Sequence, residues 1–136
     1  MKKLLFITLM LTFGLTGFSQ TITWDGSTSD DWNEGANWDG NTVPTATDDV
    51  VIPHVNADFP DVLTGETADA KSITITGTEP IDIIELFVHG TLTVVEDITV
   101  SNAASVLKIW SGGKVIYNGD IVNNGSIVVD GELVTP

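Results

Sequence analysis

The sequence predicts an all-β protein, a parallel β-helix in which short strands stack as successive rungs. From Lys71 onward, β-branched and apolar residues form short runs separated by glycine, asparagine and aspartate. No segment after the apolar N-terminus has a convincing helical period. Several runs also share one form, in which a glycine and a small or polar residue lead into a strand, as at residues 90–94, 113–117 and 125–129.

Each expected strand is too short to be stable in an isolated hairpin sheet. Stacking at a spacing of about 4.8 Å would give it a hydrogen-bonded neighbour on both sides. The expected strands are residues 72–76, 83–88, 91–95, 98–100, 106–110, 114–117, 120–122, 126–129 and 132–134. A β-sandwich is the alternative, because its turn signals come about every 8–12 residues and that spacing is partly met.

The N-terminus, residues 1–19, has the features of a secretory signal peptide. Two lysines precede an apolar stretch at residues 4–15, which is too short to span a bilayer. Small residues just before Gln20 predict cleavage at that point. We therefore expect a mature chain that is secreted, lies outside the cell or at the cell surface, and is not inserted in a membrane.

The formal net charge of −14 limits the classes of partner. After the leader the only cations are Lys71, Lys108 and Lys114, so the field repels phosphate backbones and argues against nucleic-acid binding. Without cysteine, stability must come from a hydrophobic core and the strand ladder. The length suits one domain, in which a cap rich in tryptophan and aspartate (residues 20–68) precedes solenoid rungs (residues 69–136).

Three of the four tryptophans, Trp24, Trp32 and Trp38, lie close together among turn residues and carboxylates. One interpretation is that they form a lid over the first rung, where burying each ring would stabilise the fold by a few kcal/mol, on the order of 1.5–3. The other is that exposed indole rings stack on a glycan while nearby carboxylates accept its hydroxyls. Their position immediately before the first repeat favours the lid.

The same segment suggests a structural calcium ion as the one candidate cofactor. Clustered carboxylates with loop carbonyls can provide the six to eight oxygen ligands of calcium. The candidate ligands are Asp25, Asp30, Asp31, Asp39, Asp48 and Asp49. Their spacing matches no calcium-loop motif, and aspartate also favours turns for local reasons, so solvated turn residues are the alternative.

The chemistry-bearing residues do not predict an enzyme. The two histidines, His54 and His89, lie about 35 positions apart, and neither has a nucleophile motif beside it. The absence of arginine argues against a polysaccharide lyase. Paired acids would act as a glycosidase pair only at a separation of about 5–9 Å, so a truncated glycoside-active enzyme is the least favoured interpretation.

The tryptophans belong to a longer pattern of motifs. Its elements are Trp24-Asp25-Gly26, Asp31-Trp32, Asn37-Trp38, Pro44 and Asp49-Val50-Val51-Ile52-Pro53. Behind a leader that ends in Ser-Gln, this pattern resembles the opening module of large secreted surface proteins of Bacteroidetes-type bacteria. The resemblance implies a right-handed parallel β-helix, type IX secretion and a C-terminal sorting domain for surface attachment.

This chain departs from that pattern at its C-terminus. It ends at Pro136 within an expected rung, with neither a polar cap nor a sorting domain. We therefore expect either a truncated gene product or a solenoid completed by self-association through an uncapped C-terminal rung.

Together these observations predict a secreted, non-enzymatic structural or adhesion module of the cell surface or the extracellular space. The alternative is a carbohydrate-binding module of a larger polysaccharide-acting protein. The expected partners are extracellular polysaccharide or other surface proteins.

Overall fold

The computed structural model describes residues 19–55, 57–77 and 83–136, so residues 1–18 of the expected signal peptide lie outside the described part. The first rung and the strand before it are β1 (Thr21–Thr23), β2 (Asp49–Pro53), β3 (Asp61–Val62) and β4 (Thr67–Ala70). The following strands are β5 (Ser72–Thr76), β6 (Ile84–Val88), β7 (Thr91–Val94), β8 (Ile98–Val100), β9 (Ser105–Ile109) and β10 (Lys114–Tyr117). The last are β11 (Ile121–Asn123), β12 (Ser126–Val129) and β13 (Glu132–Val134), and two single 3-10 turns, η1 (Gly35–Asn37) and η2 (Asp39–Asn41), lie between β1 and β2.

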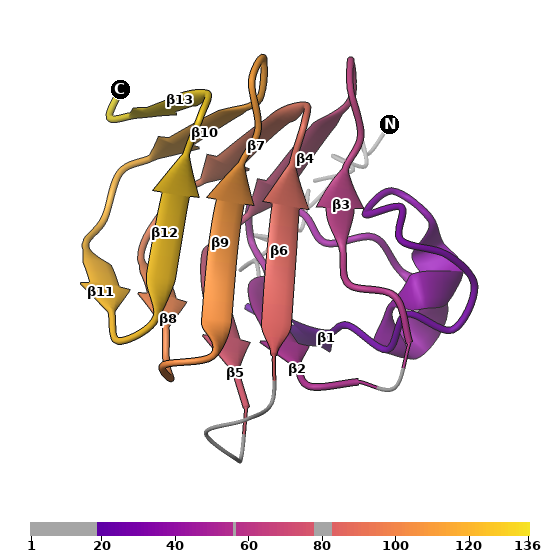
Figure 1. The fold of residues 1–136 in the computed structure, drawn as a ribbon. Coiled ribbons are helices and arrows are strands. Elements are labelled where there is room, and N and C mark those ends of the chain that lie inside the picture. Colours follow the sequence, from indigo (N-terminus) through magenta and orange to yellow (C-terminus); the bar gives the residue numbers. More distant parts are fainter. Residues whose placement is uncertain (1–18, 56, 78–82) are drawn as a thin grey trace, which may run out of the picture.

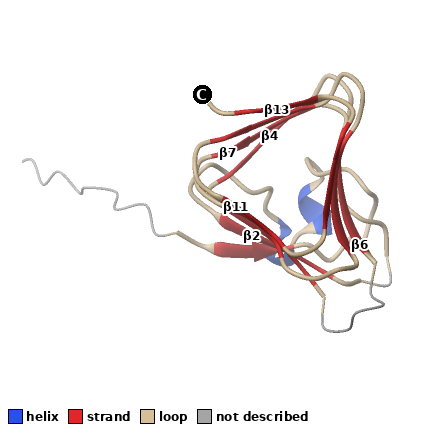
Figure 2. Ribbon diagram, turned by 60° about the vertical axis from the view of Figure 1, so that its left-hand side comes forward, coloured by secondary structure: helices blue, strands red, loops and turns tan. Residues whose placement is uncertain are grey.

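The strands form three sheets, because the chain returns to the same face after every third strand. Their orders are β1-β2-β5-β8-β11, β13-β10-β7-β4 and β12-β9-β6-β3. We call each group of three consecutive strands from β2 onward a rung. In Figure 2 the three sheets enclose a roughly triangular cross-section.

These pairings confirm the parallel β-helix and rule out the β-sandwich. Every pairing between named strands of the described residues is parallel, whereas a sandwich is built from antiparallel sheets. In Figure 1, β6, β9 and β12 run upward on the near face while the chain advances from right to left, which is a right-handed winding.

The core lies inside the triangle and consists of columns of like residues. One column runs through Ile22, Val50, Ile73 and Ile98, which are partners in register along one sheet and are all at most 2% exposed. Along β2 and along β4 to β9, buried and less buried residues alternate, as in the pattern of β5. The period of two in the sequence thus places aliphatic side chains inside and polar ones outside.

Glycines at one corner allow the rungs to approach closely. A Cβ atom on Gly113 would lie 2.1 Å from the carbonyl oxygen of Val88, and one on Gly131 would lie 2.2 Å from the carbonyl oxygen of Gly113. Gly90, Gly113 and Gly131 each directly precede a strand of the same sheet, β7, β10 and β13 respectively. Gly125, which the sequence pattern groups with the first two, precedes β12 on a different sheet.

No helix in the described part of the chain is long and apolar enough to cross a membrane.

Candidate functional site

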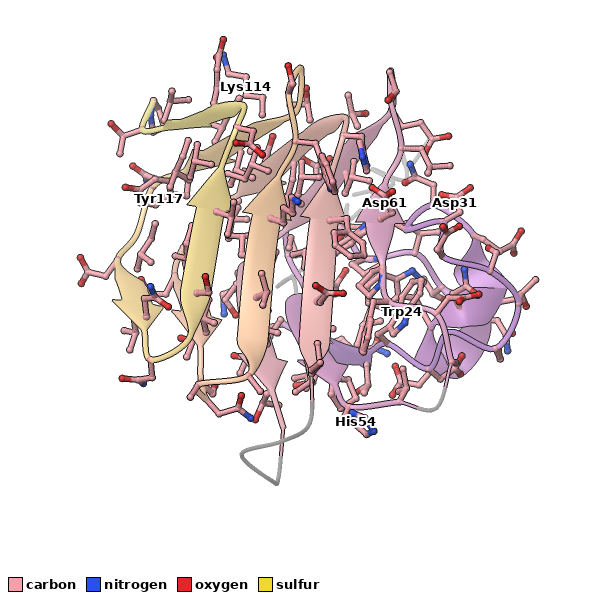
Figure 3. The ribbon with its side chains drawn as sticks, in the orientation of Figure 1. Trp24, Asp31, His54, Asp61, Lys114 and Tyr117 are labelled. Carbon is pink, nitrogen blue, oxygen red and sulfur yellow. The ribbon has the colours of Figure 1, made fainter. Side chains whose placement is uncertain are left out.

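The tryptophan segment closes one end of the solenoid. Trp24, Trp32 and Trp38 are at most 1% exposed. The ring of Trp38 packs edge to face against both others, with centroid distances of 4.9 Å to Trp24 and 4.7 Å to Trp32. In Figure 3, Trp24 lies among the side chains between the cap loops and the strands. From here on we call residues 20–48 the cap, because residues 49–68, which the sequence prediction included in it, contain β2, β3 and the start of β4 of the first rung.

Hydrogen bonds fix the orientation of two of these rings. Trp24 Nε1 donates to the carbonyl oxygen of Asp58 at 2.8 Å, and Trp38 Nε1 donates to that of Trp32 at 2.7 Å. Because all three rings are at most 1% exposed, none has a free face for a sugar to stack on. Of the two interpretations of these tryptophans, the structure therefore agrees with the lid. It shows no exposed aromatic platform for a glycan at these three positions.

Asn37 organises the cap loops, and it was not predicted from the sequence. Its side chain is fully buried, and its Oδ1 accepts from the backbone N–H groups of Thr28 and Ser29, at 2.9 and 2.8 Å. Its Nδ2 donates to Ser29 Oγ and to the carbonyl oxygen of Asp31. A buried amide with all these partners rigidifies the loop around it. The only hint in the sequence was the Asn-Trp pair.

The acidic residues of the cap satisfy local backbone groups. Asp25 accepts from the N–H of Ser27, and Asp31 from that of Asn33, each two residues ahead. The Asp39 carboxylate accepts from the N–H of Thr23, and the Asp48 carboxylate accepts from the N–H and the hydroxyl of Thr45. Asp30 contributes through its backbone, since its carbonyl oxygen accepts from the N–H of Asp61. Among described residues no three His, Cys, Asp or Glu side chains are placed to hold a metal ion. The predicted calcium ligands are therefore not gathered into one site.

Asp49 is the only one of these acids placed in a strand, at the outward start of β2. Its carboxylate accepts from the hydroxyl of Ser19, from the hydroxyl of Ser72 at 2.7 Å and from Lys71 Nζ at 3.3 Å. The hydrogen bond from Ser19, followed by that from Ser72, holds the pKa of this carboxyl below its usual value of 3.8. This carboxylate links the start of β2 to the start of β5 and to Ser19, two residues before β1.

A second cluster lies on the outer side of β3, β6 and β9, and we call it the corner cluster: Asp61, His89, Lys108 and Trp110. His89 Nδ1 lies 2.8 Å from Asp61 Oδ1, and the His89 ring stacks on Trp110 with a centroid distance of 5.2 Å. Lys108 Nζ lies 3.4 Å from the centroid of the Trp110 ring. The other histidine, His54, lies at the opposite end of the strands from Asp61 in Figure 3, so the two histidines form no joint site.

Next to the corner cluster the surface contains a hollow of about 390 Å³, the corner hollow. On one side it is lined by Thr91, Lys114 and Glu132, which are partners in register on β7, β10 and β13. The two turns that lead into β10 and β13 contribute Gly112, Gly113, Asp130 and Gly131. Lys114 Nζ lies 2.9 Å from Glu132 Oε2.

A family model described as a domain of unknown function, DUF8693, matches residues 23–133. The chain belongs to this family. The match begins within β1 and ends within β13, so the DUF8693 domain comprises the cap and the rungs together. No curated protein and no solved structure matches the chain.

Proposed function

We propose that the DUF8693 domain is a secreted, non-enzymatic structural and adhesion module of the cell surface or extracellular space. The observation that carries this proposal is the continuous three-sided ladder, closed at one end by a buried aromatic lid. Such a ladder is rigid along its axis and presents outward side chains in regular columns. These properties suit a scaffold that displays surface groups.

Export is part of this proposal and rests on the sequence. The features of residues 1–19 support cleavage before Gln20, and the motifs of the cap resemble those of type IX-secreted surface proteins of Bacteroidetes-type bacteria. The test is to express the full chain with its own leader in such a bacterium and to fractionate the culture. We expect a product that starts at Gln20 in the medium or on the surface. Uncleaved protein confined to the cytoplasm would contradict the proposal.

Adhesion is tested with beads that carry the mature chain. We expect them to be retained on bacterial cell surfaces or on insoluble polysaccharides such as cellulose, chitin and xylan, and beads that carry heat-unfolded protein to be lost. Release of reducing ends from the same polysaccharides would show an enzyme instead. Failure of folded and unfolded beads to differ on every surface would contradict adhesion.

Carbohydrate recognition is the second candidate function. The observation that favours it is the corner hollow, which combines hydrogen-bond donors and acceptors on rigid strand ends. It replaces the buried tryptophans as the place where a glycan would bind.

A further inference from the structure

We propose that the corner hollow is a binding site for a neutral saccharide. This inference rests on carbohydrate recognition, the second candidate function above, and gives it a place and a ligand class. Three observations support it: the polar residues that line the hollow, the in-register placement of those that lie on strands, and the open space in front of Gly112.

The lining offers both kinds of hydrogen-bonding group. Asp130 and Glu132 provide carboxylate acceptors, Lys114 provides a charged donor, and the Thr91 hydroxyl acts as either. A sugar hydroxyl is at once donor and acceptor, so a ring with several hydroxyls can pair with all of them. Lys114 and Glu132 already pair at 2.9 Å, with exposed side-chain fractions of 39% and 62%, so both are accessible to a ligand.

The same lining argues against the other ligand classes. An anion, such as a uronic acid, would be repelled by the carboxylates of Asp130 and Glu132 and by the negative charge of the whole chain. A divalent cation lacks a third carboxylate or imidazole among the described residues and meets Lys114. An apolar molecule finds no large aliphatic or aromatic side chain in the lining. A neutral molecule rich in hydroxyls is the class that remains.

The backbone around the hollow is held in place before any ligand arrives. The N–H of Gly113 donates to the carbonyl oxygen of Trp110 at 2.8 Å, and the N–H of Glu132 donates to that of Gly113 at 2.9 Å. A Cβ atom on Gly112 would meet nothing within 4 Å, so the space in front of this residue is open. Preformed strand ends reduce the entropy cost of ordering the site on binding.

The test is an NMR titration of the ¹⁵N-labelled mature chain with named neutral probes: cellohexaose, xylohexaose, laminarihexaose and mannohexaose. Trigalacturonic acid and chitosan hexamer serve as the anionic and cationic comparisons. With at least one neutral probe we expect shift changes at Gly112, Gly113 and Gly131. We expect a smaller or no effect with the acidic probe at the same concentration.

Two variants locate the site. Gly112→Asn places a side chain in the open space at φ +88°, a region that asparagine tolerates better than other residues, and should weaken binding at least tenfold. Its matched control is Gly40→Asn in the cap, where φ is +75° and the space is also empty, and binding should not change. Glu132→Gln should weaken binding about three- to tenfold through a lost charge-assisted hydrogen bond, whereas Glu85→Gln on β6 should not.

Unfolding curves of each variant show whether it is folded. Three results would overturn the inference: no shift with any neutral probe, binding of the chitosan hexamer alone with loss at high salt, or binding unchanged in folded Gly112→Asn. Shift changes confined to another surface would refute the hollow while leaving carbohydrate recognition intact. Shifts at the hollow without any retention of beads would refute adhesion and leave the hollow intact.

Discussion

Asp61 and His89 join two successive rungs through a contact of 2.8 Å between Oδ1 and Nδ1. Asp61 is 8% exposed, and its strand, β3, contains only two residues. The backbone ladder between β3 and β6 is correspondingly short, with two register pairs. The side-chain contact therefore reinforces the weakest strand pairing on this face.

We predict that Asp61→Ala lowers the free energy of unfolding by about 1 kcal/mol, because an intramolecular hydrogen bond typically contributes 0.5–1.5 kcal/mol. A double-mutant cycle with His89→Ala should give a coupling energy of about 0.5–1.5 kcal/mol. His54→Ala, on an exposed loop, is the control and should leave stability unchanged. Additive effects of Asp61→Ala and His89→Ala in urea unfolding would show that the contact contributes nothing.

Some strands could be predicted from the sequence and others could not, and β3, which contains Asp61, is one that could not. Alternation predicted β5, β8, β10, β12 and β13 with their observed bounds, because each is a β-branched run that needs no partner to be recognised. β3 and β4 lack such a run: Asp61–Val62 is too short, and Thr67–Ala70 contains two alanines and an aspartate. Their strand conformation comes from register with β6 and β7, residues more than twenty positions away.

The corner cluster and the corner hollow were beyond prediction for the same reason. His89 meets Asp61 and Trp110 only once the register of three rungs is known, and the irregular spacing of the corner glycines conceals that register. The lid was predictable, because three large rings placed just before the first rung need burial, whereas the hydrogen bonds of Asn37 were not.

We predict that Trp38→Phe destabilises the domain more than Trp32→Phe does. Both changes remove similar ring area, but Trp38 Nε1 donates to the carbonyl oxygen of Trp32, while Trp32 Nε1 is buried without a partner among the described atoms. The difference in unfolding free energy should be about 1 kcal/mol. Equal losses in thermal and urea unfolding would mean that the Trp38 hydrogen bond is not a net contributor.

We predict that Asp49 makes stability depend on pH in the acid range in a chain that retains Ser19, because the Ser19 hydroxyl donates the hydrogen bond that lowers the Asp49 pKa most. Cleavage before Gln20 removes this donor and leaves Ser72 and Lys71 as the partners of the carboxylate, so the effect should be smaller in the mature chain. Its pKa is lower in the folded chain than the usual 3.8, so the unfolded chain binds its proton more readily. The contribution is therefore complete above about pH 5, and it is lost as the pH falls through the folded pKa. In Asp49→Asn the difference in unfolding free energy from the parent should shrink from pH 6 to pH 2.

The cause of that shift is checked separately. Ser72→Ala removes one hydrogen bond to the carboxylate and should raise the pKa of Asp49 toward 3.8 in an NMR titration of its carboxyl carbon. For Asp49→Asn, the matched control is Asp69→Asn on the exposed side of β4, which also removes one negative charge. A pH profile of Asp49→Asn that runs parallel to the parent would contradict the prediction.

We predict opposite tolerances at two adjacent glycines. Gly113→Ala forces a Cβ atom to within 2.1 Å of the Val88 carbonyl oxygen, and rigid backbone must move, so it should cost about 3 kcal/mol or prevent folding. The Cβ atom of Gly112→Ala would lie within 4 Å of no atom, so this change should destabilise the fold only through the strain of an alanine at φ +88°, by about 1–2 kcal/mol. Thermal unfolding ranks the two, and equal melting temperatures would refute the close approach of the rungs at this corner.

We predict that the mature chain self-associates through its last rung, and that salt strengthens the association. β11, β12 and β13 are each the outer strand of their sheet, so their outer backbone groups are open to pairing with another chain. Val129 is 44% exposed there, and the excess of 19 acidic residues over the three lysines that follow the leader opposes contact at low salt. In sedimentation velocity Val129→Glu should reduce association at least fivefold, whereas Val95→Glu, at a residue 41% exposed between β7 and β8, should not. Equal effects of the two changes would place the contact elsewhere, and a monomer at every concentration and salt level would show that the edge is not an interface between copies.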